Sequence, residues 1–161
     1  AQAGIEKSMT ALAAGLAGGN LIYESSGMMA SLLGASFEAF LIDNDMHSAI
    51  YRTMRGIEIN DETMSLEAIE AAITGDGHFL GHDSTLAAME RDYVYPELSD
   101  RGPPITWSEQ GRQDIWGRAN QRAKLILDEY HPQYLTPDID RKIRQKLPIH
   151  LHLNRPAVGN D

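Results

Sequence analysis

The sequence of 161 residues contains no cysteine. Disulfide scaffolds, zinc ribbons and thiol nucleophiles are therefore excluded. No apolar run comes near the roughly 20 residues that a membrane-spanning helix needs. The start of the chain has no basic segment followed by an apolar one, as a targeting signal would have. These absences predict a cytoplasmic protein that does not bind membranes.

Basic residues are also scarce. Lys and Arg total 14 against 23 Asp and Glu, so the formal net charge is −9. This acid excess argues against binding to nucleic acid or to an anionic membrane, because both attract basic surfaces. Apolar residues make up 42% of the chain, which is enough for a packed core and excludes a disordered tail.

Apolar residues recur at the spacing of one helix face in six segments. The predicted helices cover residues 3–17, 36–55, 60–73, 83–95, 106–130 and 137–147. Ser36 is a candidate N-cap of the second helix, Gly56 follows its end, and Asp83 or Ser84 is a candidate cap of the fourth. The side chains of the second helix that we expect to be buried are Phe37, Phe40, Leu41, Ile50 and Met54.

Residues 20–24 are short and β-prone, and they form the best strand candidate in the chain. A single strand cannot satisfy its own backbone N–H and C=O groups and needs a sheet. The predicted fold class is therefore a mostly α-helical piece with one or two short strands, which resembles the closing part of an α/β fold. The chain opens on Ala1 and Gln2 without an initiator Met, so we expect it to begin inside a longer protein.

Two histidine pairs were considered as metal ligands. His78 and His82 would share a face on a helix, but glycines around them favour a loop, and packing or capping is the preferred interpretation. His150 and His152 lie on one side of an extended tail, where we prefer a disordered or docking end. We therefore predict no metal site.

Two other motifs have structural interpretations. Asp43-Asn44-Asp45 resembles the start of a calcium loop, but the required Gly and distal Glu do not follow, so a solvated helix face is preferred. Gly18 and Gly19 end a helix and enter the strand candidate. A phosphate loop needs the reverse order, a strand followed by glycines and then a helix.

The segment that follows the strand candidate is the predicted binding site, because α/β folds bind ligands beyond the carboxyl ends of strands. It offers a phenol, a carboxylate, two hydroxyls and two thioethers, and Tyr and Met suit a methylated cation. An ordinary loop, with the methionines in the core, is the alternative. The candidate substrate-binding residues are Tyr23, Glu24, Ser25, Ser26, Gly27, Met28 and Met29.

A series of collinear segments resembles the C-terminal part of the trimethylamine methyltransferase family, whose members are corrinoid-dependent. No single motif is decisive, but the order and spacing run through nearly the whole chain. The segments are Ala1-Gln2-Ala3-Gly4-Ile5-Glu6-Lys7, Gly19-Asn20-Leu21-Ile22-Tyr23, Ala35-Ser36-Phe37-Glu38, Arg55-Gly56-Ile57-Glu58, Asp61-Glu62-Thr63, Gly77-His78-Phe79-Leu80-Gly81 and Arg118-Ala119-Asn120.

The resemblance implies a (β/α)₈ barrel, of which this chain supplies the last strand and helix and a helical C-terminal extension. Residues 1–56 would be the closing helix–strand–helix segment of the barrel. Residues 57–147 would form the helical extension and residues 148–161 a tail. Most of the barrel would lie upstream.

The resemblance also implies the chemistry. Family members move a methyl group from a methylated amine to the cobalt of a separate corrinoid protein, so the cobamide is carried by that partner and none is bound directly. Trimethylamine enzymes use a pyrrolysine that lies upstream of the matched region, and other relatives act on quaternary amines. We assign no catalytic residue to this chain and expect it to be inactive alone.

The sequence departs from the family pattern just after the candidate site. Ala30 stands where related chains carry a carboxylate, Leu32 replaces a glycine and Gly34 replaces a threonine. These departures favour a different methylated substrate or a degenerate paralogue. The alternative function is a non-enzymatic helical module that docks a corrinoid protein or self-associates. In either case we expect a homo-oligomer, because exposed apolar faces need a partner.

Overall fold

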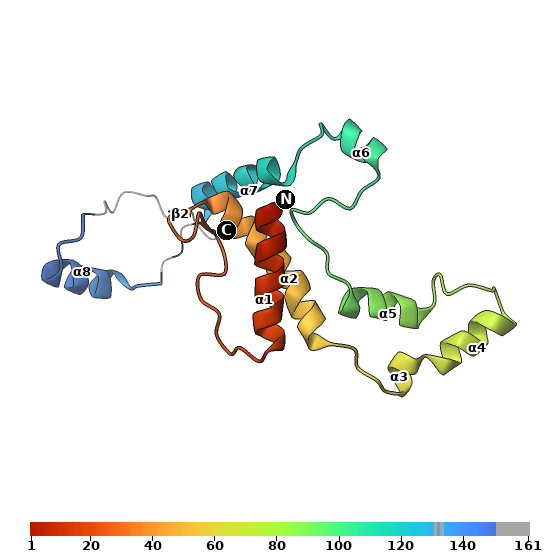
Figure 1. Cartoon of the computed structure of the whole chain (residues 1–161). Coiled ribbons are helices and arrows are strands. Elements are labelled where there is room, and N and C mark those ends of the chain that lie inside the picture. Colours follow the sequence, from red (N-terminus) through yellow and green to blue (C-terminus); the bar gives the residue numbers. More distant parts are fainter. Residues whose placement is uncertain (131, 133, 151–161) are drawn as a thin grey trace. The chain divides into compact units, whose positions relative to one another are not determined.

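The computed structural model describes residues 1–130, 132 and 134–150, and these are mostly helical (Figure 1). The chain divides into two compact units, residues 1–119 and 120–161, which are described separately. The predicted segment boundaries after residues 56 and 147 stay a prediction. Within the described part of the chain, no helix is long and apolar enough to cross a membrane.

The first unit holds six complete helices, a two-stranded sheet and the start of a seventh helix. In chain order these are α1 (Gln2–Leu16), β1 (Met28–Met29), β2 (Gly34–Ala35), α2 (Phe37–Arg55), α3 (Asp61–Met64), α4 (Leu66–Thr74), α5 (Asp83–Asp92), α6 (Pro104–Glu109) and α7 (Ile115–Glu129). The second unit holds the rest of α7 and α8 (Pro137–Lys146), which begins with a proline at its first position.

Helices α1 and α2 pack side by side and form the centre of the first unit (Figure 1). As predicted, Ser36 caps α2, and its hydroxyl accepts a hydrogen bond from the Ala39 N–H at 3.2 Å. Gly15 of α1 lies against Met54 of α2 so closely that an added Cβ would stand 2.4 Å from the Met54 sulfur. The absence of a side chain at Gly15 therefore lets the two helices approach.

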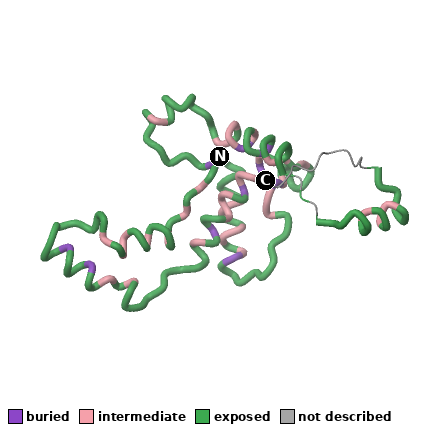
Figure 2. The backbone as a smooth tube through the Cα atoms, turned by 180° about the vertical axis from the view of Figure 1, so that it is seen from behind, coloured by how far each residue is buried: buried purple, intermediate pink, exposed green. Residues whose placement is uncertain are grey.

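The core consists mainly of small residues, and most of the backbone outside it is exposed (Figure 2). Its buried apolar members are Ala39, Ile50, Ala68, Ala72, Leu98, Ala119 and Ala123. The prediction of burial was right for Ile50 but wrong for Phe37 and Phe40, which are 65% and 55% exposed, and for Met54, which is 37% exposed. A helical period identifies an apolar face, but burial also needs a partner element, and the described residues supply too few.

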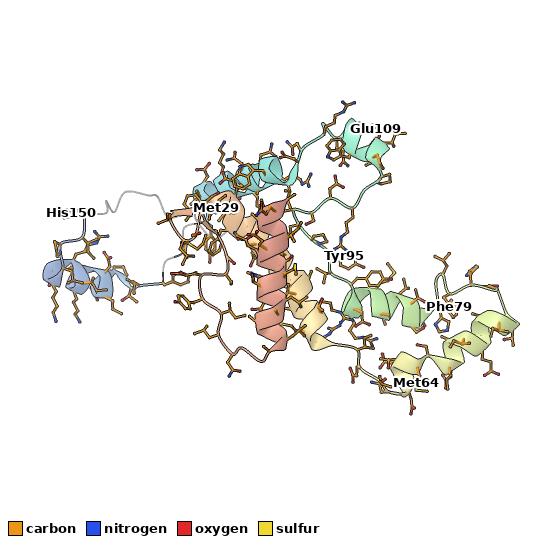
Figure 3. The ribbon with its side chains drawn as sticks, viewed as in Figure 1. Met29, Met64, Phe79, Tyr95, Glu109 and His150 are labelled. Atoms are coloured by element: carbon orange, nitrogen blue, oxygen red, sulfur yellow. The ribbon has the colours of Figure 1, made fainter. Side chains whose placement is uncertain are left out.

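The predicted strand at residues 20–24 is wrong, because these residues are irregular. β-Prone residues form a strand only where a neighbouring strand can pair with them. The two strands found are short and lie further along the chain. They pair antiparallel, with Met28 opposite Ala35 and Met29 opposite Gly34; Met29 is labelled in Figure 3.

Two predicted helices are interrupted. The helix predicted over 60–73 is broken at Ser65, whose φ of 52° is left-handed, and becomes α3 and α4. The helix predicted over 106–130 becomes α6 and α7, separated by Gly111 and Arg112 with φ values of 92° and 56°. A left-handed residue turns the chain out of a right-handed helix, and apolar periodicity does not reveal such a residue when it is not glycine.

Three consecutive residues at the tip of the β1–β2 hairpin are left-handed without being glycine: Ala30, Ser31 and Leu32, with φ values of 50°, 54° and 70°. A left-handed conformation costs an L-residue roughly 1–2 kcal/mol.

Replacing Leu32 by glycine should therefore raise the free energy of unfolding by about 0.5–1 kcal/mol, the strain released less the added entropy of the unfolded chain. Leu33→Gly is the matched control, because Leu33 is 90% exposed and has no left-handed φ. Denaturant unfolding of both variants checks this. Equal stability changes at the two positions would show that the tip is not strained.

Three arginines surround one carboxylate where α5 ends beside α2. The Asp92 carboxylate accepts hydrogen bonds from Arg55 at 2.6 Å, Arg91 at 3.0 Å and Arg52 at 3.2 Å. The hydrogen bond from Arg91 is the main cause that holds the pKa of Asp92 below its usual value, and the positive charges of Arg91, Arg52 and Arg55 add to it.

The pKa of Asp92 is lower in the folded state than in the unfolded state, where it is about 4. The stability that Asp92 contributes is therefore fully present above the unfolded-state pKa. It is lost as the pH falls through the folded-state pKa. Asp92→Asn should therefore flatten the acid limb of the stability–pH curve. Asp76→Asn, in the turn after α4, should leave that limb unchanged. Unfolding free energies measured from neutral pH to about pH 3 check this.

Candidate functional site

The first unit contains a pocket of about 850 Å³ between α1, the loop that precedes β1, the hairpin, α2 and the start of α7. Small and apolar side chains form most of its wall. The apolar lining residues are Ala1, Ala3, Gly4, Ala11, Ala14, Ile22, Met28, Met29, Ala30, Leu32, Ala39, Ile42, Ile115 and Trp116. The polar and charged ones are Glu6, Lys7, Thr10, Glu24, Ser25, Ser31 and Asp43.

Four of the seven predicted site residues line this pocket: Glu24, Ser25, Met28 and Met29. Ser26 and Gly27 line an adjacent hollow on the α2 side, which they share with Met28. Tyr23 lines neither and is 79% exposed. The structure thus places four of the seven predicted residues in the wall of one pocket. The role of these residues in substrate binding stays a prediction.

Asp43 of α2 is the polar centre of this region. The residue is 4% exposed, and its Oδ2 accepts hydrogen bonds from Lys7 Nζ of α1 at 2.5 Å and from the Gly27 N–H at 2.8 Å. A buried carboxylate of this kind needs both a counter-charge and donors. The interpretation of this motif as a solvated helix face is therefore wrong for Asp43, because the neighbouring α1 and loop cover it.

One turn further along α2, His47 contacts Ser26, the residue before Gly27. The Ser26 hydroxyl and His47 Nδ1 are 3.2 Å apart. Among the described residues His47 Nε2 has no hydrogen-bond partner, although it is buried. Asp43 and His47 are four residues apart and share a helix face, so α2 fixes two successive loop residues from one side.

Gly27 itself fits only as glycine. Its φ is +77°, and an added Cβ would stand 2.8 Å from Phe40 Cδ2. The loop therefore passes directly over α2 at this residue, which places Met28 and Met29 at the pocket. The sequence alone gave no reason for a glycine here.

Asp45, the other acid of the motif, anchors a distant loop. Its carboxylate accepts hydrogen bonds from the Glu97 N–H at 2.9 Å and from the N–H and hydroxyl of Ser99 at 3.1 and 2.9 Å. This loop carries the buried Leu98, whose carbonyl accepts a hydrogen bond from Arg118 Nε at 2.7 Å. Asp45 thereby helps to hold the start of α7, which includes Trp116, at the pocket.

Sequence reasoning missed three residues of the site: Lys7, Asp43 and Trp116. Lys7 lies 36 positions from Asp43 in the sequence, and Trp116 is further still. The acidic motif of α2 contains Asp43, but the preferred interpretation of that motif was a helix face exposed to solvent. No local pattern indicated that Trp116 would join the pocket, because a chain of tertiary contacts places it there.

The charges around the pocket favour a cation. Its side chains include three carboxylates and one ammonium, a formal side-chain charge of −2. The Lys7 ammonium is already paired with Asp43. Glu24 stands in a left-handed conformation with a φ of 58°, a form of strain that occurs often at ligand sites. An anionic, mostly apolar pocket with an indole and two thioethers suits a small ammonium ion with apolar substituents.

Of the four histidines with metal-ligand spacing, His82 has a structural role. His82 lies in a turn rather than a helix, and its Nδ1 accepts a hydrogen bond from the Ser84 N–H at 3.2 Å, so it caps α5 in place of the predicted Asp83 or Ser84. Phe79 of the same turn is labelled in Figure 3. His152 lies outside the described residues. Within the described residues, no three His, Asp or Glu side chains form a group that could hold a metal ion.

The family model described as trimethylamine methyltransferase (MTTB) matches residues 1–147. The chain belongs to this family. The resemblance drawn from the sequence is thus confirmed. Similar relatives include the glycine betaine methyltransferase of Desulfitobacterium hafniense (strain Y51), 33% identical over 144 residues. The trimethylamine methyltransferases MttB of D. hafniense (strain DSM 10664 / DCB-2) and of Methanosarcina barkeri are both 34% identical, over 144 and 139 residues.

The match is unequal in extent. It covers 89%, 89% and 86% of this chain in the three comparisons, but only 30%, 28% and 27% of the relatives. The chain thus spans less than a third of the length of the curated relatives it matches.

Proposed function

We propose that this chain is the C-terminal part of a methyltransferase that moves a methyl group from a methylated amine to a corrinoid protein. The observation that carries the proposal is the anionic, mostly apolar pocket in a chain of this family. A methylated ammonium ion needs negative charge nearby together with apolar surface for its methyl groups. The pocket combines the two.

The proposed roles of the residues follow from their chemistry. Glu24 supplies negative charge for the ammonium nitrogen. Met28, Met29 and the face of Trp116 contact its methyl groups and exclude water, which holds a methyl group in one orientation. None of these residues needs to accept a proton when a quaternary amine reacts, because a neutral tertiary amine leaves.

We further propose that the rest of the parent protein forms a (β/α)₈ barrel and that the cobamide is carried by a separate corrinoid protein. When bound there, reduced cobalt supplies the nucleophile that takes the methyl group. The donor set of the pocket, three carboxylates and one lysine, suits an ammonium substrate, so the corrinoid would approach from outside. The chain alone would transfer no methyl group, since the corrinoid protein and the proposed barrel lie outside it.

The experiment is a methyl-transfer assay of the parent protein with trimethylamine and quaternary amines as donors and a cob(I)amide as acceptor. We expect methyl-cobalt absorbance to appear with at least one donor. Glu24→Gln should raise KM for that donor, while Glu70→Gln on the exposed face of α4 should not. Absence of methyl transfer with every methylated amine would contradict the proposal.

The second candidate is a non-enzymatic module that docks a corrinoid protein or self-associates. Many large apolar side chains of the first unit are exposed, including Ile5 and Met9 of α1 and Phe37 of α2. Apolar surface of this kind is typical of interfaces. Light scattering of the 161-residue chain tests self-association. We expect an oligomer, and a monodisperse monomer with a cooperative thermal transition would exclude self-association.

A further inference from the structure

We propose that the ion pair between Lys7 and Asp43 sets the charge specificity of the pocket. The pair makes the pocket favour a methylated ammonium ion over a methylated amine that also carries a carboxylate. This inference rests on the proposed function and deepens it, because it names the residues that select between two classes of substrate.

Two of the three carboxylates that line the pocket accept hydrogen bonds from neighbouring side chains. Asp43 is buried, and its Oδ2 receives both Lys7 Nζ and the Gly27 N–H. Glu6 accepts a hydrogen bond from Gln2 at 2.7 Å. Within the described residues Glu6 and Glu24 make no ion pair, so both carboxylates keep their charge to attract a ligand cation, and Glu24 makes no hydrogen bond that would hold it away from the ligand.

The lysine is the one cationic side chain that lines the pocket, so it is the side chain with which a ligand carboxylate would pair. Its ammonium is held against the wall by Asp43 and is neutralised there. A ligand carboxylate must then enter a pocket of net negative charge without a free counter-ion, which is unfavourable at short range in a partly buried site. A ligand with only an ammonium group meets no such barrier.

Asp43→Asn separates this electrostatic role from a structural one. The amide Oδ1 of asparagine can still accept the Gly27 N–H, so the loop keeps its anchor. The lysine loses its partner, and its positive charge becomes available to the ligand. The variant should therefore repel a cation and attract a carboxylate, whereas simple damage to the pocket would weaken every ligand alike.

The test uses the 161-residue chain and two probes, tetramethylammonium and glycine betaine, whose binding is followed by NMR of the methionine methyl groups. The wild type should bind tetramethylammonium more tightly. Asp43→Asn should weaken tetramethylammonium about tenfold and leave glycine betaine unchanged or tighter, which reverses the order. An equal loss for both probes would overturn the inference.

If Asp43→Asn does not fold, the double variant Lys7→Met/Asp43→Asn tests the inference in its place. It removes both charges and should bind tetramethylammonium within about threefold of the wild type and more tightly than glycine betaine, because an absent lysine and a neutralised one both leave a ligand carboxylate without a counter-ion. Equal affinity of the double variant for the two probes would overturn the inference. If the wild type binds neither probe, the proposed function fails, and the inference fails with it.

Discussion

Replacing Gly27 by alanine should lower the free energy of unfolding by about 3 kcal/mol. The left-handed φ of +77° costs an L-residue roughly 1–2 kcal/mol. The new Cβ would also stand 2.8 Å from Phe40 Cδ2 and 3.1 Å from Phe40 Cβ, and overpacking of this kind costs about 1–3 kcal/mol. Denaturant unfolding of the variant measures the sum.

Gly81→Ala is the matched control, because Gly81 has the same φ of +77° but no atom within 4 Å of an added Cβ. It should cost only about 1–2 kcal/mol, so the difference between the two variants isolates the contact with Phe40. Adding Phe40→Ala to Gly27→Ala should recover part of that difference. Equal losses at the two glycines would show that the loop does not pass closely over α2.

Lys7→Met should lower the free energy of unfolding by about 2 kcal/mol. It leaves the buried Asp43 carboxylate with the Gly27 N–H and without a counter-charge. Removal of one partner of a buried pair costs up to about 5 kcal/mol, and the partial exposure of the lysine, 25%, reduces this figure. Methionine keeps the aliphatic length, so little packing should be lost.

Two further variants test the cause of that loss. Lys7→Met/Asp43→Asn should restore most of the stability, since no uncompensated charge remains. Lys124→Met, at an exposed lysine of α7, should change the stability by less than about 0.5 kcal/mol. A double variant as unstable as Lys7→Met alone would show that the uncompensated Asp43 charge is not the cause of the loss.

The helices were predictable from the sequence where capping and periodicity agree. Ser36 and Gly56 bound α2 as expected, and Pro137 opens α8. The break at Ser65 was not predictable, because this residue is left-handed without being glycine, whereas Gly111 was a signal in the sequence for the break between α6 and α7. Residues 20–24 do not form a strand although they are β-prone, because β-prone residues form a strand only where a partner strand can pair with them.

The candidate site was predictable in part. The segment from Tyr23 to Met29 was predicted from its chemistry, and four of its seven members line the pocket. The other wall comes from α1, α2 and α7, and it depends on tertiary contacts that no local pattern encodes. Asp43 shows the difficulty, because its acidic neighbours made it look solvated while the fold buries it against Lys7.

The most direct test of the account is a titration of the 161-residue chain with tetramethylammonium, followed at the methyl groups of Met28 and Met29. The account predicts saturable shifts at both residues and an affinity about fivefold lower in Trp116→Ala, because a cation–π contact is lost. Tyr23→Ala should bind as the wild type does. Unshifted Met28 and Met29 signals, or equal binding by Trp116→Ala and the wild type, would contradict the claim that this pocket holds a methylated ammonium ion.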